Sequence, residues 1–229
     1  IQKEIDWYEV EIPHDWLIYD TQNLYETGEG WYKKSFMIDK IEEQVARIYF
    51  EGVYMNSTVF INGEEVGVWR YGYSSFEFDV TKYLHVGENT ILVRVKHEAP
   101  NSRWYSGAGI YRNIYLKITS PIYLVSDGVY IVTDADEGNI AITNEINEKA
   151  GYQSSNLVLR HSILDKNGIV VTTNNKNITA ESDEEVDCDT AFTTTHCVSN
   201  QLHIDSPSLW NLENCYLYTL KTELLCDGE

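Results

Sequence analysis

One stretch of the sequence predicts a β-hairpin: Thr58-Val59-Phe60-Ile61-Asn62-Gly63-Glu64-Glu65-Val66-Gly67-Val68-Trp69. Two short runs rich in apolar residues flank the dipeptide Asn62-Gly63. A two-residue type I′ turn needs a positive φ angle at both central positions, and Asn and Gly tolerate that conformation better than other residues. We therefore predict two antiparallel strands, at residues 58–61 and 65–69.

Further short strands are predicted on both sides of this hairpin. Apolar and aromatic residues alternate, wholly or in part, in segments bounded by turn residues, and no segment sustains the 3.6-residue period of a helix. The expected strands lie at residues 31–38, 46–50, 76–80, 90–96 and 114–118. Residues 79–84 allow one helical turn at most. Many short strands at regular spacing predict a sandwich or a barrel.

The strand pattern restarts after Thr119-Ser120-Pro121, which predicts a domain boundary. The later strands are expected at residues 129–132, 139–146, 156–164, 169–171, 201–204 and 216–224. About seven strands in a domain of this length fit an immunoglobulin-like sandwich, although the Cys-Trp-Cys pattern of antibody domains is absent from the sequence. An acidic stretch at residues 181–185 predicts a solvated loop or an edge strand. The chain is thus predicted to be all-β, with domains at residues 1–119 and 120–229.

Charge excludes one class of partner. The chain of 229 residues holds 36 acidic and 17 basic residues, which gives a formal net charge of −19. Such a surface repels a phosphate backbone, so no nucleic acid is expected as a partner. No apolar run approaches the roughly 18 residues that a membrane helix needs, so no membrane is expected either. The first residues lack the basic and apolar regions of a signal peptide, although such a peptide could have been removed, so both cytoplasm and periplasm stay open as locations.

The potential metal ligands are scattered. None of the cysteines forms a CxxC pair, and no histidine is spaced with them as in a zinc site. We expect partly buried thiols rather than disulfides, at Cys188, Cys197, Cys215 and Cys226. The histidines form no cluster, so neither a metal nor a cofactor is predicted. The adjacent His14 and Asp15 are interpreted as a structural turn beside a packed Trp16.

Several motifs, taken in order, resemble family 2 of the glycoside hydrolases, of the β-galactosidase type. The matching segments are IPHDW at 12–16, GWYKKSF at 30–36, FEGV at 50–53, VFINGEEVG at 59–67, GYSSFEFDVT at 72–81, RWYSGAGIYR at 103–112, PSLW at 207–210 and YLY at 216–218. The segment at 103–112 is the most specific, and the resemblance covers essentially the whole chain. Cys215 departs from the family's usual Pro, which we expect to alter a turn rather than the fold.

The resemblance implies a jelly-roll β-sandwich of the galactose-binding-domain type, followed by an immunoglobulin-like β-sandwich. It also implies a parent enzyme that is a retaining glycosidase. In such enzymes two glutamates about 5–5.5 Å apart act as acid/base and nucleophile, and in this family they lie in a (β/α)8 barrel after the second sandwich. The sequence shows no βαβ alternation. We therefore expect no catalytic residue here and no activity of this part alone.

The resemblance also indicates which loop serves the sugar. In the family, the loop before the GIYR segment walls the sugar pocket, and it corresponds to residues 101–105. An aromatic ring stacks on the apolar face of galactose, while amide and guanidinium groups bind hydroxyls. The candidate substrate-binding residues are Asn101, Arg103, Trp104 and Tyr105. The alternative is that Trp104, Tyr105 and Arg112 pack the two sandwiches together.

Three functions compete at this point. The first is the N-terminal part of an enzyme whose active site, completed by a barrel, hydrolyses terminal β-galactosides in carbohydrate catabolism. The second is a stand-alone carbohydrate-binding module, since jelly rolls host lectins. The third is a structural or adhesive pair of sandwiches, which the ordered motifs disfavour. The PHDW and RWY segments resemble β-galactosidases more than β-glucuronidases or β-mannosidases, and a homo-oligomer stays open.

Overall fold

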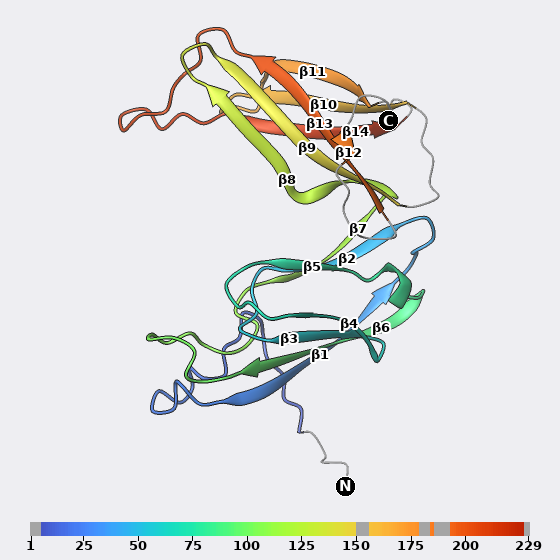
Figure 1. The fold of residues 1–229 in the computed structure, drawn as a ribbon, viewed down its shortest axis with the longest axis vertical. Coiled ribbons are helices and arrows are strands. Elements are labelled where there is room, and N and C mark those ends of the chain that lie inside the picture. Colours follow the sequence, from blue (N-terminus) through green and yellow to red (C-terminus); the bar gives the residue numbers. More distant parts are fainter. Residues whose placement is uncertain (1–5, 150–155, 179–183, 186–192, 227–229) are drawn as a thin grey trace. The chain divides into compact units, whose positions relative to one another are not determined.

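The computed structural model describes residues 6–149, 156–178, 184–185 and 193–226. It consists of antiparallel strands in two compact units, Ile1–Thr119 and Ser120–Glu229 (Figure 1). The predicted all-β class is confirmed: a jelly-roll sandwich is followed by an immunoglobulin-like sandwich.

Two sheets form the first unit. One sheet has the strand order β1-β6-β3-β4 and the other has the order β5-β2-β7. The elements are β1 (Gly28–Ile38), β2 (Val45–Phe50), β3 (Ser57–Ile61), β4 (Glu64–Trp69), β5 (Phe76–Asp79), the short 3₁₀ helix η1 (Thr81–Tyr83), β6 (Gly87–His97) and β7 (Ile114–Thr119). Strand β6 begins before the predicted strand at residues 90–96 because Gly87 already pairs with Ile38, the last residue of β1.

The predicted hairpin is confirmed by its backbone. Asn62 and Gly63 have φ angles of 51° and 87°, as a type I′ turn requires. The Asn62 side chain also fastens the turn to its surroundings. Its Nδ2 donates to the Tyr83 carbonyl at 2.9 Å and to Asn89 Oδ1 at 2.8 Å, and its Oδ1 accepts the Thr90 N–H at 2.9 Å. The turn is therefore held against the start of β6.

The core of the first unit follows from alternation along the strands. In β6, Ile91, Val93 and Val95 are buried while the residues between them are only half-buried. The rings of Phe50 and Phe76 stack in this core, with centroids 4.6 Å apart. Burial of each large apolar side chain contributes about 1.5–3 kcal/mol, which makes this packing the main source of stability.

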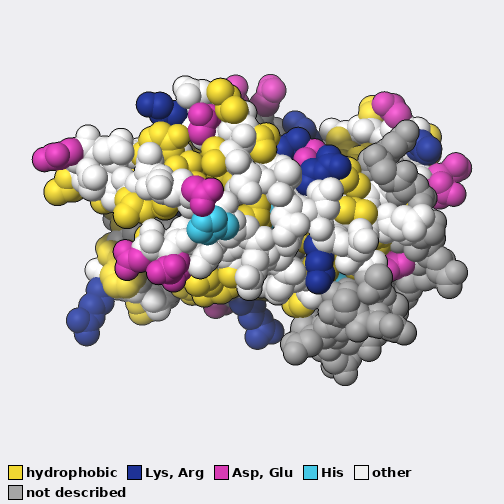
Figure 2. All heavy atoms as spheres, turned by 90° about the horizontal axis from the view of Figure 1, so that it is seen from above, with side chains coloured by type: hydrophobic (Ala, Val, Ile, Leu, Met, Phe, Trp, Pro, Cys, Tyr) yellow, Lys and Arg dark blue, Asp and Glu magenta, His cyan; other side chains and the backbone are white. Residues whose placement is uncertain are grey.

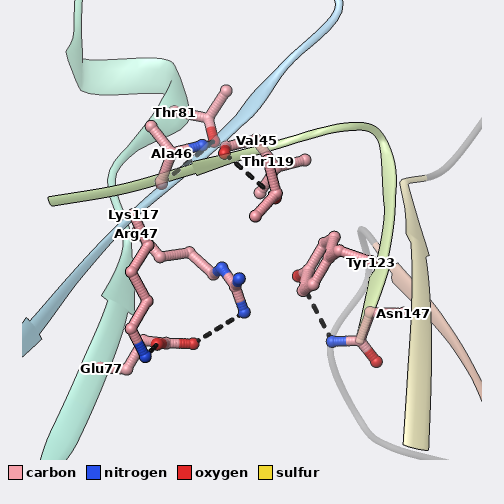
Figure 3. A network of polar contacts seen from close by, with 9 residues as sticks. All are labelled: Val45, Ala46, Arg47, Glu77, Thr81, Lys117, Thr119, Tyr123 and Asn147. Carbon is pink, nitrogen blue, oxygen red and sulfur yellow. Dashed lines mark hydrogen bonds and ion pairs between the residues drawn. The ribbon is translucent and has the colours of Figure 1, made fainter. Parts of the chain in front are cut away.

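An ion group spans the sheet β5-β2-β7 (Figure 3). Glu77 on β5 accepts from the Arg47 guanidinium at 2.9 Å and from Lys117 Nζ at 3.1 Å. Lys117 also lies 3.7 Å from the centroid of the Tyr49 ring. Arg47 is buried, so its charge needs this partner. Both cations are thus committed to holding neighbouring strands together.

The second unit also has two sheets, with the strand orders β12-β13-β9-β8 and β11-β10-β14. Its elements are β8 (Ile122–Asp134), β9 (Asn139–Lys149), β10 (Leu157–Leu164), β11 (Val170–Ile178), β12 (Glu184–Glu185), β13 (Thr193–His203) and β14 (Thr219–Cys226). Residues such as Ile146, Leu159 and Val198 form its core. The pair Glu184–Glu185 is an edge strand, as the acidic stretch allowed, and the rest of that stretch lies outside the described residues.

Sequence reasoning placed the last strand too early. Residues 216–218 were predicted to belong to it, but β14 begins at Thr219, which pairs with Leu164 at the end of β10. Residues before Thr219 therefore have no strand to pair with. The rings of Tyr216 and Tyr218 pack against each other instead, with centroids 4.9 Å apart.

The cysteines agree with the prediction only in part. Cys197 and Cys226 are half-buried, as expected, whereas Cys215 is exposed. Cys188 lies outside the described residues. Cys215 lies in the loop before β14, at the position where the sequence departs from the family pattern that it otherwise resembles.

A polar group lies in the interior of the second unit. The two ring nitrogens of His161, Nε2 and Nδ1, lie 2.8 Å from Asn144 Nδ2 and 3.0 Å from Asn200 Nδ2. Asn200 Oδ1 accepts in turn from Asn174 Nδ2 at 2.9 Å. His161 and Asn144 are fully buried, and burial lowers the pKa of His161. We call these four residues the histidine group.

Candidate functional site

The loop predicted to serve the sugar lies between β6 and β7, and the N-terminal segment holds it. The His14 N–H donates to the Ile110 carbonyl at 2.7 Å, and the Trp16 N–H donates to the Ala108 carbonyl at 3.0 Å. Two motifs that lie far apart in the sequence, at 12–16 and 103–112, are therefore neighbours. Their pairing sets the position of residues 101–105.

The Asp15 carboxylate holds this loop in place through hydrogen bonds. Its Oδ1 accepts the N–H groups of Leu17 and Ala108, both at 3.0 Å, and its Oδ2 accepts the Tyr105 hydroxyl. Burial and the hydrogen bond to Asp15 together raise the pKa of Tyr105. Gly107 is required here, because a Cβ atom would lie 2.6 Å from Asp15 Oδ2. The predicted turn at Asp15 is thus structural, and Tyr105 points into that structure.

His14 has a similar supporting role. It is buried, and its Nδ1 lies 2.8 Å from the Tyr32 hydroxyl. Burial lowers the pKa of His14 despite the nearby charge of Asp15, and burial also raises the pKa of Tyr32. Both shifts favour the neutral forms, which suit a packed contact rather than proton transfer.

Asn101 orders the loop from within. Its Nδ2 lies 2.7 Å from the Glu98 carbonyl and 3.1 Å from His97 Nε2, and its Oδ1 accepts the Ser106 hydroxyl at 3.1 Å. His97 is buried, and its Nδ1 lies 2.6 Å from the Glu26 carbonyl. Asn101 is itself exposed, so its amide borders solvent while it closes the loop.

Trp104 belongs to an aromatic cluster that sequence reasoning did not assemble; three of its rings are exposed, and the fourth, Tyr54, is buried. Its Nε1 donates to the Tyr73 hydroxyl at 3.1 Å. The Tyr73 ring lies 5.1 Å from the Tyr54 ring and 5.9 Å from the Tyr71 ring, both edge-on. Trp104, Tyr71 and Tyr73 are 60%, 61% and 49% exposed. We call Tyr54, Tyr71, Tyr73 and Trp104 the aromatic cluster.

Gly72 makes this cluster possible. A Cβ atom at this position would lie 2.1 Å from the Tyr54 ring. The Gly72 carbonyl also accepts the Tyr111 hydroxyl at 2.6 Å, which ties the 70–75 loop to the 98–113 loop. The segment YGY at 71–73 was visible in the sequence, but nothing there indicated that it meets Trp104, because the contact depends on tertiary packing.

The four predicted site residues therefore divide into two pairs. Asn101 and Tyr105 make hydrogen bonds that shape the loop, whereas Arg103 and Trp104 are exposed. Arg112, just before β7, is exposed as well. The structure thus offers one arginine and one indole ring to a ligand at the predicted place.

A separate hollow of about 250 Å³ lies beside the N-terminal segment, and none of the predicted site residues lines it. It is lined by Trp16, Leu17, Asp20, Asn23, Glu26, Gly28 and Glu29. Across the described ranges, no group of three or more His, Cys, Asp or Glu side chains is arranged to hold a metal ion. Nor does any helix there have the length and apolar character to span a membrane.

Three described carboxyl groups have altered acidity, and each pKa is lowered. Lys96 lowers the pKa of Glu98, the Ile169 N–H lowers that of Asp165, and Lys221 lowers that of Glu223. The general acid of a glycosidase needs a raised pKa instead. None of these three carboxyl groups suits that role.

Comparison with known families gives two matches. Residues 7–119 match the family described as "Glycosyl hydrolases family 2, sugar binding domain", and residues 123–229 match "Glycosyl hydrolases family 2". Together the two matches cover nearly the whole chain, and they meet close to residue 120.

Individual relatives carry different names. A beta-galactosidase of Bacteroides ovatus is 39% identical over 98% of this chain, and a putative beta-glucuronidase of Formosa agariphila is 33% identical over 97%. The chain spans only 27% and 21% of their respective lengths. A solved glycosyl hydrolase family 2 member from Bacteroides cellulosilyticus superposes with a TM-score of 0.84 at 32% identity, covering 99% of this chain and 32% of that one.

Proposed function

Because this chain belongs to glycosyl hydrolase family 2, we propose that it is the non-catalytic N-terminal part of a retaining β-glycosidase. In this proposal a barrel elsewhere in the parent protein supplies the two glutamates. The jelly roll supplies one wall of the sugar site through the loop at residues 101–105. The supporting fact is that the chain spans only 27% and 21% of the lengths of two relatives, which are named a beta-galactosidase and a putative beta-glucuronidase.

The observation that carries the site is the exposed ring of Trp104. Its indole nitrogen is bound to Tyr73, and the loop below it is fastened by Asp15. A ring that is fixed before the ligand arrives loses little conformational freedom on binding. Trp104 would stack on the sugar, and Arg103 would donate to its hydroxyls. Asn101 and Tyr105 would act mainly by holding the loop, with the Asn101 amide at its border.

We further propose that the parent cleaves terminal β-galactosides. The relative with 39% identity is named a beta-galactosidase, and the PHDW and RWY segments resemble that type. The competing specificity is for β-glucuronides, since relatives at 33% and 30% identity are named putative beta-glucuronidases. β-Mannosides are a third possibility that the resemblance allows.

The test is hydrolysis of aryl β-galactoside and aryl β-glucuronide by the longer parent protein and by this chain. We expect the parent to cleave the galactoside and this chain to cleave neither. Trp104→Ala in the parent should raise KM about tenfold, as loss of one stacking contact implies. Tyr130→Ala, which removes an exposed tyrosine of the second unit, is the control. Turnover by this chain alone would contradict the proposal.

The aromatic cluster also supports the alternative of a carbohydrate-binding module that works without a barrel. In that case this chain would bind sugar by itself as tightly as the longer protein does. If the sugar site needs both walls, the chain alone should bind at least tenfold more weakly. Equilibrium titration of the two proteins with the same galactoside separates these outcomes.

A further inference from the structure

The loops around the aromatic cluster have an unusual charge for this protein. Residues 70–75 and 99–112 contain three arginines and no Asp or Glu, although the chain as a whole has a formal net charge of −19. On the face shown in Figure 2, acidic side chains are scattered rather than gathered at one place. The two loops thus carry a net positive charge, whereas the chain as a whole is negatively charged.

Each of the three arginines is next in the sequence to an aromatic residue. That residue belongs either to the aromatic cluster or, for Tyr111, to the loop contact beside it. Arg70 precedes Tyr71, and Arg103 precedes Trp104. Arg112 follows Tyr111, whose hydroxyl binds the Gly72 carbonyl. Consecutive Cα atoms lie about 3.8 Å apart, so all three arginine side chains start from the rim of this group of rings. Burial raises the pKa of Tyr111, and the charge of Arg112 opposes that rise, so this charge lies close to the Tyr111 ring.

These arginines are available to a ligand. Arg70, Arg103 and Arg112 are exposed, and none of them forms an ion pair with a carboxylate in the described part of the chain. The carboxylates of the neighbouring segments are already engaged, since Asp15 accepts from Tyr105 and Glu98 pairs with Lys96 at 2.5 Å.

Elsewhere in the unit the buried cation is neutralised. Arg47 and Lys117 share Glu77 in the ion group of Figure 3. Among the described arginines of the first unit, four have no carboxylate partner. Three of them lie at the rim of the aromatic cluster, and the fourth, Arg94, donates a hydrogen bond to Thr58. Exposed arginines beside exposed aromatic rings are complementary to a ligand that carries negative charge and also has an apolar face that can stack on a ring.

We propose that the aromatic cluster together with Arg70, Arg103 and Arg112 binds an oligosaccharide that carries carboxylate or sulfate groups. The rings would stack on the apolar face of a sugar. The planar guanidinium group pairs with carboxylate or sulfate oxygens through two parallel hydrogen bonds, which a neutral hydroxyl does not match. This inference rests on the proposed function in taking a sugar as the ligand, but it concerns this chain alone and needs no barrel.

The test uses the 229-residue chain and a pair of ligands that differ at one carbon. Methyl β-galactoside and its C6-carboxylate counterpart, methyl β-galacturonide, are titrated at low salt while the ring resonances of the protein are followed by NMR. We expect the carboxylate to bind about tenfold more tightly, and 0.5 M NaCl to remove most of the difference by screening. Galactose 6-sulfate forms a third arm, which distinguishes a sulfated from a carboxylated ligand.

Variants locate the effect. Arg70→Gln and Arg112→Gln should each reduce the preference for the anion several-fold while leaving binding of the neutral galactoside unchanged, whereas Arg103→Gln should weaken binding of both ligands and of the anion more strongly. Lys34→Gln removes an exposed cation of β1 and is the matched control. Equal binding of the neutral and anionic sugars, no binding of either up to tens of millimolar, or an equal loss in the Lys34 variant would overturn the proposal. Activity of the parent enzyme is measured separately, so failure here leaves the proposed function standing.

Discussion

Replacing His161 with Leu should destabilise the second unit by about 3 kcal/mol. The side chains are similar in volume, so the variant opens no large cavity and the effect is polar. The substitution removes two hydrogen bonds, at 2.8 and 3.0 Å, each worth about 1 kcal/mol net. It also leaves the buried amide of Asn144 without a partner, which costs about 1–3 kcal/mol. Asn200 is affected less, because it keeps its contact with Asn174.

The protonation state of His161 follows from the same contacts. Asn200 Oδ1 accepts from Asn174 Nδ2 and from the Gln201 N–H, so its Nδ2 faces the ring and His161 Nδ1 must accept. A neutral ring with an acceptor at Nδ1 carries its hydrogen on Nε2. The hydrogen on Nε2 needs an acceptor from Asn144. The Asn144 side-chain amide is therefore rotated by 180°, so that Oδ1 faces the ring in place of Nδ2.

Stability should therefore depend on pH through this residue. Burial holds the pKa of His161 below its ordinary value of 6.5, so the unfolded chain binds the proton more readily than the folded chain. The contribution of the neutral ring is complete above about pH 6.5 and is lost as pH falls toward the lower pKa of the folded state. Protonation would place a hydrogen on Nδ1 facing the Asn200 amide, which offers it no acceptor.

Urea unfolding and hydrogen exchange of the β9, β10 and β13 amides measure this effect in the second unit. At pH 7.5, His161→Leu should lose about 3 kcal/mol, and the double variant Asn144→Leu/His161→Leu should recover at least half of that. Between pH 7.5 and 5.5 the wild-type protein should lose more stability than His161→Leu does. A single-variant loss below 1 kcal/mol, or an additive loss in the double variant, would refute this account of the histidine group.

Four further substitutions test the first unit. Asp15→Asn should lower its stability by about 2 kcal/mol, because a charged acceptor of several hydrogen bonds is lost; urea unfolding measures the loss, and Tyr105→Phe should cost less. Gly72→Ala should cost about 1–3 kcal/mol by overpacking against Tyr54, and the near-ultraviolet circular dichroism of the tyrosines should change with it. Phe50→Ala should cost about 3–5 kcal/mol in the same unfolding assay, since the fully buried ring leaves a cavity.

The strands of the first unit were largely predictable because their signals are local. The turn at Asn62-Gly63 needs only the conformational preferences of two residues, and the alternation in β6 needs only one buried face. Strand limits were less predictable. The last strand starts at Thr219 rather than at residue 216 because its partner strand β10 ends at Leu164, which is a tertiary constraint.

For the candidate site, the sequence singled out a loop but not the arrangement of its side chains. Resemblance to the family directed attention to residues 101–105, and the structure shows that Arg103 and Trp104 are exposed there. It did not indicate that Tyr105 turns toward Asp15, or that Tyr73 meets Trp104. Contacts between residues tens of positions apart depend on how the loops pack, and a single sequence carries no signal for them.

The strand order of the first unit has a consequence for its synthesis on the ribosome. Strand β2 is the middle strand of its sheet, and one of its two neighbours is β7, the last strand of the unit. Until Ile114–Thr119 has emerged, the nascent chain exposes one full edge of β2. The N-terminal segment likewise waits for residues 108–110 before it can pair. The unit should therefore complete its fold in one late step, after nearly all of its residues have been translated, and it depends until then on protection of that open edge.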